Sequence, residues 1–207
     1  MSWQGSPAPY RIETKRLVIR RYERRDAPLL KEAIDSSLDH LQPWMPWALG
    51  EPQTLEQKEE LIEAFRAGFA AGENFTYGIF AADETVLLGG TGLHPRVGPG
   101  GLEIGYWIRA SATRQGLVTE ATAALTRVGL EVCGADRIEI RIEPRNQASL
   151  GVPRKLGFLE EATLRRRLPS REGSPLRDVT IFTMFREEFD PAIAPLRAFD
   201  ALGRQLV

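Results

Sequence analysis

The sequence predicts a single domain of the α/β class, in its α+β form, with a sheet of about seven strands and several helices. Its 207 residues suit one sizeable core, and 43% hydrophobic with 27% charged residues is an ordinary globular balance. Segments with the two-residue alternation of strands are interleaved with segments whose apolar residues recur at helical spacing. Since no repeat or long linker divides the chain, we expect one main domain at 11–189 after an N-terminal extension at 1–10.

The first third of the chain predicts a strand, a helix, a shaped loop and a second helix. Residues 11–22 alternate charged and apolar side chains, as a strand does. Asp26 is expected to cap the helix that follows, because its carboxylate can accept hydrogen bonds from the first turn. Residues 41–47 contain two prolines and two tryptophans, so this segment predicts an extended or turning loop. Thr54 and Gln57 form a capping-box pattern for a helix that Gly72 ends.

The middle of the chain predicts an antiparallel meander, a helix and another strand. Segments 76–82, 86–94 and 102–109 read as three strands joined by short turns. From Val118 the apolar residues recur at helical spacing, which predicts a buried-face helix of about four turns that stops at Gly134. Residues 137–142 predict a strand.

The last third predicts a short helix, two strands and a helical tail. The short helix begins at Asn146 and ends at Gly157, and strands follow at about 158–164 and 178–186. In the tail, residues 190–207, apolar side chains recur at helical spacing, so we expect a helix that covers an exposed edge or meets a second subunit in a homodimer. The apolar residues of this tail are Ile193, Leu196, Phe199 and Leu202.

The composition limits the partners, disulfides, metal sites and membrane segments to be expected. With a net charge of -1 the chain has no bulk attraction for nucleic acid or an anionic membrane. Cys133 is the only cysteine, so an internal disulfide and a cysteine-rich metal site are excluded, and a reducing cytoplasm fits. Residues 1–10 lack the pattern of a secretion signal, and no apolar run could span a membrane. One local basic cluster reads as a solvated strand and loop: Arg165, Arg166, Arg167, Arg171 and Arg177.

A strand, a loop and a helix start at 103–121 predict a phosphate-binding turn. The first turn of a helix exposes unpaired amides, and the helix dipole adds positive potential there. Gly116 lets the main chain approach a ligand, Arg114 adds a charge, and Thr119 adds a hydroxyl group. The segment alone is equally compatible with an ordinary turn from a strand into a helix. A second polar pair, Asn146 and Ser149, is three residues apart at a helix start, a spacing that suits either ligand contact or helix capping.

With these segments in place, the sequence resembles the GNAT superfamily of N-acetyltransferases, in particular its RimJ/RimL-like branch of ribosomal-protein acetyltransferases. The resemblance spans nearly the whole domain, and its order and spacing are specific although no single motif suffices. The segments that carry it are Thr14–Arg20, Leu41–Ala48, Gly105–Ile108, Gln115–Ala121, Asn146–Phe158 and Arg177–Phe182.

The resemblance implies a GNAT-like fold in which a mixed, mostly antiparallel sheet splays apart after the strand that ends near Arg109. Acetyl-CoA is the implied cofactor, with its pantetheine arm in the gap and its diphosphate at 114–119. The cofactor-binding residues so implied are Trp107, Ile108, Arg109, Arg114, Gln115, Gly116, Leu117, Val118, Thr119, Asn146 and Ser149. The catalytic set is Asn146, Ser149 as proton donor to the leaving thiolate, and Glu161 as general base.

The implied acceptor is a primary amine, and an N-terminal α-amine suits a weak base best, because its pKa is about 7.7 to 8.0 while that of lysine is about 10.4. Four side chains are candidates for acceptor binding, each with a structural alternative: Trp44, Trp47, His94 and Glu103. A small-molecule amine acceptor, such as an antibiotic, a polyamine or an amino acid, stays open. So does a CoA-binding module without catalysis, because the family usually has other residues at Thr113 and Val118. Pro153 predicts a kink in the short helix.

Overall fold

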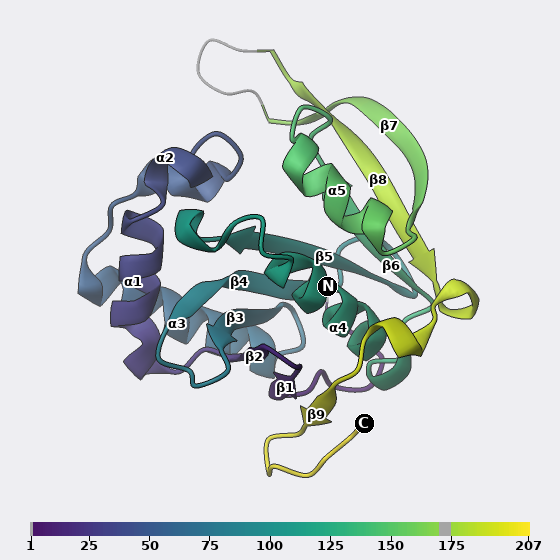
Figure 1. Ribbon diagram of the computed structural model, residues 1–207, viewed down its shortest axis with the longest axis horizontal. Helices are drawn as coiled ribbons and strands as arrows, with labels where there is room; N and C mark the ends of the chain where they lie inside the picture. Colours follow the sequence, from purple (N-terminus) through teal and green to yellow (C-terminus); the bar gives the residue numbers. More distant parts are fainter. Residues whose placement is uncertain (1, 170–174) are drawn as a thin grey trace.

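One nine-stranded sheet forms the centre of the computed structural model, which describes residues 2–169 and 175–207. The strand order is β7-β8-β6-β5-β4-β3-β2-β1-β9, and all neighbours are antiparallel except β5 and β6 (Figure 1). The strands are β1 Arg11–Glu13, β2 Leu17–Arg21, β3 Phe75–Ala81, β4 Leu87–His94, β5 Gly101–Ile108, β6 Arg137–Ile142, β7 Leu159–Leu168, β8 Arg177–Phe185 and β9 Arg197–Phe199. The mixed, mostly antiparallel sheet is confirmed, with nine strands in place of about seven.

One of the two additional strands arises because the expected strand at 11–22 is broken by a tight turn. The Thr14 amide donates to the carbonyl of Leu17 at 2.9 Å, and the Leu17 amide donates to the Thr14 hydroxyl at 3.1 Å. These reciprocal bonds fold the chain back on itself, so β1 and β2 pair as a hairpin.

The other additional strand replaces the helix predicted for 190–207, which is wrong. Residues Pro191–Ile193 form a single 3₁₀ turn, and β9 pairs antiparallel with β1, which would otherwise be the edge of the sheet. Pro191 and Pro195 provide no amide donors for a regular helix. The apolar spacing does not mark one buried face either, because Leu202 is 77% exposed.

In the described part of the chain, five α-helices flank the sheet: α1 Ala27–Asp35, α2 Leu38–Leu41, α3 Leu55–Ala70, α4 Leu117–Arg127 and α5 Gln147–Lys155. The capping box at Thr54 and Gln57 is confirmed, and α3 gives way to a left-handed Gly72 as predicted. A π-helical turn, Val128–Val132, continues α4 towards Gly134. Helix α4 packs against β2, β4 and β5, while α1 and α3 pack on each other and against β4 and β3, respectively.

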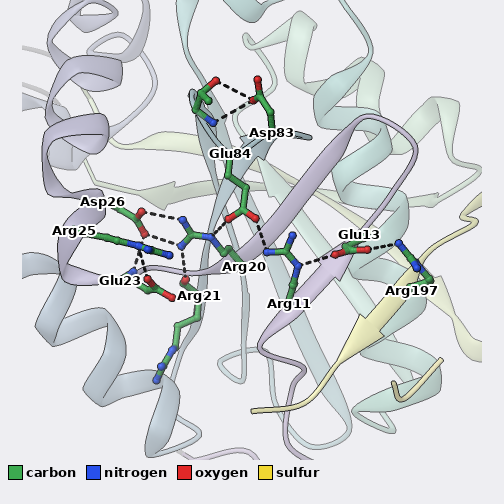
Figure 2. Close-up of polar contacts among 11 residues, drawn as sticks. Arg11, Glu13, Arg20, Arg21, Glu23, Arg25, Asp26, Asp83, Glu84 and Arg197 are labelled. Carbon is green, nitrogen blue, oxygen red and sulfur yellow. Dashed lines mark hydrogen bonds and ion pairs between the residues drawn. The ribbon is translucent and has the colours of Figure 1, made fainter. Parts of the chain in front are cut away.

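The predicted capping role of Asp26 is wrong, because its carboxylate makes other contacts. Asp26 accepts two hydrogen bonds from the Arg20 guanidinium, at 2.7 and 2.9 Å, and one from the Glu23 amide at 2.8 Å. Figure 2 shows that this pair begins a chain of alternating charges that runs through Glu84 and Arg11 towards β9. These ion pairs connect the start of α1, the β3–β4 turn and the β1–β2 hairpin.

Two further predictions concern single residues and a cluster. Cys133 is fully buried in the core, as expected, and burial raises the pKa of its thiol to about 12. Of the arginine cluster, Arg165–Arg167 are exposed on β7, Arg177 pairs with Glu143, and Arg171 lies outside the described residues. Within the described ranges, no helix has the length and apolar character needed to cross a membrane.

Candidate active site

The central feature of the site is a split between the parallel strands β5 and β6. They pair only at their beginnings, where Gly101, Leu102 and Glu103 lie opposite residues 137–139. Beyond this point β5 stays paired with β4 up to Ile108, and β6 stays paired with β8 up to Ile142. The facing edges of β5 and β6 therefore carry unpaired main-chain groups, and Figure 1 shows β7 and β8 running at an angle to β4 and β5. The sheet is splayed beside the strand that the family resemblance indicated.

Strand alternation decides which β5 groups face the split. The Arg109 amide donates to the Leu88 carbonyl of the β4 side at 2.8 Å, and the Trp107 carbonyl lies 2.2 Å from the position that a Cβ on Gly89 of β4 would take. Residues 107 and 109 therefore direct their main chain at β4, and Ile108 directs its amide and carbonyl into the split. The main-chain groups of Trp107 and Arg109 are thus taken up on the β4 side and are not available to a pantetheine arm in the split, against the expectation. The role of Ile108 stays a prediction.

The Arg109 side chain is also directed away from the split. Its guanidinium donates to both carboxylate oxygens of Glu32 on α1, at 2.6 and 2.9 Å, and it is only 13% exposed. Trp107 packs edge-on against Trp47, with ring centroids 5.8 Å apart, in the apolar cluster beneath α1 and α3. The Arg109 side chain therefore ties the end of β5 to α1, and the Trp107 side chain packs on the loop that contains Trp47.

The predicted phosphate-binding turn has an unusual main chain. Arg114 has φ of 60° and Gly116 has φ of 75°, so two left-handed residues flank Gln115 directly before α4. A left-handed conformation costs a non-glycine residue about 1–2 kcal/mol, and such strain persists mainly at functional sites. Among the described residues, no acceptor bonds the amides of Gly116, Leu117, Val118 or Thr119. These donors form a cradle with the positive end of the helix dipole, which suits a diphosphate.

The side chains of the turn fit the same ligand. Arg114 is exposed and makes no ion pair with any described residue, so its charge is available to a phosphate. The Thr113 hydroxyl donates to the Ala110 carbonyl at 3.0 Å, and Gln115 Nε2 donates to the Ser111 carbonyl at 3.1 Å. Thr113 thus stabilises the turn before the cradle, and the effect of Val118 on cofactor binding stays a prediction.

Across the split, α5 supplies the second polar constellation. Asn146 caps α5, since its Oδ1 accepts the Ser149 amide at 3.2 Å, and the Ser149 hydroxyl has no partner among the described residues. Pro153 is inside α5 but has no amide, so the carbonyl four residues earlier, that of Ser149, lacks a helical donor. The Tyr106 hydroxyl donates to this carbonyl at 3.1 Å. This bond links β5 to α5 across the split, a contact that the sequence did not predict.

Glu161 is not brought to Ser149. The Thr183 hydroxyl donates to Glu161 at 2.6 Å. Thr183 follows the core residue Phe182 on β8, and neighbouring residues of a strand point to opposite faces of the sheet. Glu161 therefore lies on the face opposite that core. Leu150 of α5 belongs to the same core, so Ser149 and Glu161 are on opposite faces of the sheet. The role of Glu161 as general base stays a prediction. Glu103 shares the face of Glu161 and pairs with Arg96 at 2.6 Å.

A cavity of about 490 Å³ lies beside the split, between the loop after α2 and the segment that follows β6. The expected acceptor residue Trp44 forms part of its wall, while Trp47 is not among the lining residues. Its polar groups include the ion pair of Glu143 with Arg177. The complete lining is Pro43, Trp44, Glu143, Pro144, Arg145, Pro175, Leu176, Arg177 and Asp178.

His94 has a structural partner, the Asn74 side chain, whose Oδ1 lies 2.9 Å from His94 Nδ1. Burial, and next the charge of Arg96, lowers the pKa of His94 to about 4. The folded state therefore keeps a neutral ring, while the unfolded chain binds a proton below pH 6.5. The stability that the neutral His94 ring contributes is therefore fully present above pH 6.5, and it is lost as the pH falls towards about 4.

We therefore expect His94→Gln to flatten the acid limb of the stability curve. Wild type should lose about 2 kcal/mol of unfolding free energy from this group, allowing for partial exposure of the ring. Urea unfolding at pH 7, 5.5 and 4.5 measures the effect. His40→Gln, at an exposed position, is the control and should leave the curve unchanged. Equal acid limbs for wild type and His94→Gln would contradict the prediction.

Comparisons with known proteins agree with this geometry. Residues 16–159 match the family model described as the acetyltransferase (GNAT) domain. The chain is 27% identical to the uncharacterised N-acetyltransferase YoaA of Bacillus subtilis, over 84% of this chain and 96% of that protein. It is 29% identical to the "Putative ribosomal N-acetyltransferase YdaF" of Bacillus subtilis, over 72% and 81%. RimJ of Mycobacterium smegmatis, solved in complex with CoA-disulfide, superposes with a TM-score of 0.75 at 25% identity, covering 91% of each chain.

Proposed function

Because the chain belongs to the acetyltransferase (GNAT) domain family, we propose that it transfers the acetyl group of acetyl-CoA to the N-terminal α-amine of a protein or peptide. Family membership makes the chain an N-acetyltransferase. The observation that best supports acetyl-CoA as the cofactor is the cradle of unpaired amides at 116–119 beside the split between β5 and β6. A diphosphate fits the cradle, and an extended arm fits an open strand edge.

The proposed chemistry is direct transfer. The amine nitrogen attacks the thioester carbonyl carbon, the C–N bond forms, and the C–S bond then breaks as the thiolate leaves. The Ile108 amide, directed into the split, suits the stabilisation of the negative charge that develops on the carbonyl oxygen. The Ser149 hydroxyl suits the return of a proton to sulfur, because it has no partner among the described residues, and solvent then replaces the proton that the serine gives up. The amine gives up its proton to solvent or a weak base, which an α-amine with pKa of about 7.7 to 8.0 allows near neutrality.

The cavity beside the split supports a peptide as acceptor. Several of its lining residues, including Pro43, Pro175 and Leu176, are exposed, so the cavity opens to solvent and can admit the end of a chain. A small-molecule amine would suit an enclosed pocket better. The similarity to YdaF, whose name is "Putative ribosomal N-acetyltransferase YdaF", agrees with a protein acceptor.

The function is tested by following free CoA thiol with a panel of acceptors. The panel contains peptides with a free N-terminus, the same peptides with a blocked N-terminus and an internal lysine, and small amines. We expect turnover with the free α-amine peptides alone. Turnover confined to small amines would overturn the peptide proposal, and no turnover with any amine would overturn the proposed acceptor class as a whole.

Trp44 provides a second test of the acceptor site. Trp44→Ala removes an apolar wall of the cavity, so KM for the acceptor peptide should rise about tenfold while KM for acetyl-CoA stays within about twofold. Trp47→Ala is the matched control, because Trp47 packs on Trp107 outside the cavity lining. Steady-state kinetics with each substrate varied in turn gives both constants. An equal rise in acceptor KM for the two variants would place the acceptor elsewhere.

A further inference from the structure

The turn between β1 and β2 reaches the start of α4, although about a hundred residues separate them in the chain. Arg16 Nε donates to Glu120 Oε2 at 2.6 Å, and the Arg16 amide donates to Glu120 Oε1 at 3.0 Å. The Thr14 hydroxyl donates to the same carboxylate oxygen at 2.6 Å. Glu120 is therefore held by three donors from one turn. Burial opposes the shift, but hydrogen bonds from Thr14 and Arg16 lower the pKa of Glu120.

The second contact of Arg16 is with the phosphate-binding turn itself. Arg16 Nη1 donates to the Gln115 carbonyl at 2.9 Å. Gln115 is the residue between the two left-handed positions, Arg114 and Gly116. A hydrogen bond at this carbonyl fixes the peptide plane between Gln115 and Gly116, so this part of the cradle need not be ordered when a ligand arrives. Arg16 Nη2 lies 3.6 Å from the position of a Cβ on Gly116, which places the guanidinium directly against the turn.

Arg16 also changes the electrostatics of the cradle. Glu120 is in the first turn of α4, where a carboxylate stabilises the helix but would compete with a bound diphosphate for the same positive potential. The ion pair with Arg16 offsets that negative charge. The one side chain thus fixes the main chain of the turn and balances the nearest carboxylate.

We propose that Arg16 is a positioning residue for the diphosphate of CoA, acting through the Gln115 carbonyl and Glu120 to keep the left-handed turn formed in the free protein. This inference rests on the proposed function, because it takes the cradle at 116–119 to hold that diphosphate.

The test is the affinity of Arg16→Met for three ligands, measured by calorimetry. CoA and dephospho-CoA both contain the diphosphate, and pantetheine contains the thiol arm alone. We expect Kd to rise about tenfold for CoA and for dephospho-CoA and to stay within about twofold for pantetheine. Thermal unfolding verifies that the variant is folded, and Arg16→Lys is the second variant if it is not. Lys15→Met removes the same charge from the exposed neighbouring residue and should leave all three Kd values unchanged.

The outcomes distinguish a failure of the Arg16 role from a failure of the proposed function. If wild type binds CoA no more tightly than pantetheine, the diphosphate cradle and the proposed function fail together. If wild type prefers CoA but Arg16→Met weakens all three ligands equally, or none, only the role of Arg16 fails. Weakening of CoA without weakening of dephospho-CoA would mean direct contact with the 3′-phosphate and would overturn the positioning role. If Lys15→Met raised the Kd values as much as Arg16→Met does, the effect would come from net charge alone, and the positioning role would be overturned.

Discussion

Replacement of Gly116 by valine is expected to lower kcat/KM for acetyl-CoA by about 100-fold or more. Gly116 has φ of 75°, a conformation that a β-branched residue rarely adopts. The valine would shift the main chain towards negative φ and turn the amides at 116–119 away from their common focus. Since main-chain donors make up the cradle, their direction is the property that the substitution removes. Gly116→Ala strains the same torsion without the branched side chain and should have a smaller effect.

The matched control is Gly203→Val. Gly203 also has φ of 75° and has no neighbouring atom within 4 Å of an added Cβ, but it lies in the C-terminal turn. It therefore carries a comparable torsional strain at a position remote from the cradle. Kinetics and calorimetry with CoA compare the two variants, with thermal unfolding to verify folding. If Gly116→Val retains wild-type CoA affinity, the turn is not the diphosphate site.

The geometry of the proposed phosphate-binding turn was predictable because its determinants are local. A glycine that precedes an amphipathic helix specifies both the left-handed residue and the exposed amides, and the structure has Gly116 directly before α4. The capping box of α3 and the cap at Asn146 were predictable for the same reason. The split between β5 and β6 is different, because no residue of either strand encodes it. It was expected only through the family resemblance.

Contacts between distant segments could not be read from the sequence. Arg16 meets Glu120 only because β2 and α4 pack together, and Tyr106 meets Ser149 only because α5 lies over the split. Pro153 was the one available signal for the latter, since a proline inside a helix leaves a carbonyl that another donor must satisfy.

The directions of Trp107 and Arg109 were misassigned for a related reason. A strand pattern gives the alternation of side chains but not which main-chain groups face which neighbour, and that depends on the register with β4. The tail does not form the helix that its spacing predicts, because pairing with the edge strand β1 decides its structure. In both cases a tertiary neighbour, which is absent from the local sequence, determined the outcome.

The largest effect on stability is expected at Arg20. Its side chain is 8% exposed, lies with its guanidinium carbon 4.0 Å from the Phe80 ring centroid, and makes two hydrogen bonds to Asp26, whose side chain is 3% exposed. Arg20→Met would leave the Asp26 carboxylate buried without its counter-charge, which typically costs about 3–5 kcal/mol. The methionine keeps much of the packing volume, so the loss should come mainly from the uncompensated charge.

A second substitution separates charge from packing in this pair. In Arg20→Met/Asp26→Asn the buried charge is gone, while the amide oxygen can still accept the Glu23 amide bond, so we expect about half of the lost stability to return. Arg197→Met at the exposed end of the same chain of charges in Figure 2, where the arginine is 65% exposed, should change the free energy of unfolding by less than about 1 kcal/mol. Urea unfolding at pH 7 measures all three variants. An Arg20→Met loss no greater than that of Arg197→Met would show that the pair contributes little, because the core can then accommodate Asp26 without its partner.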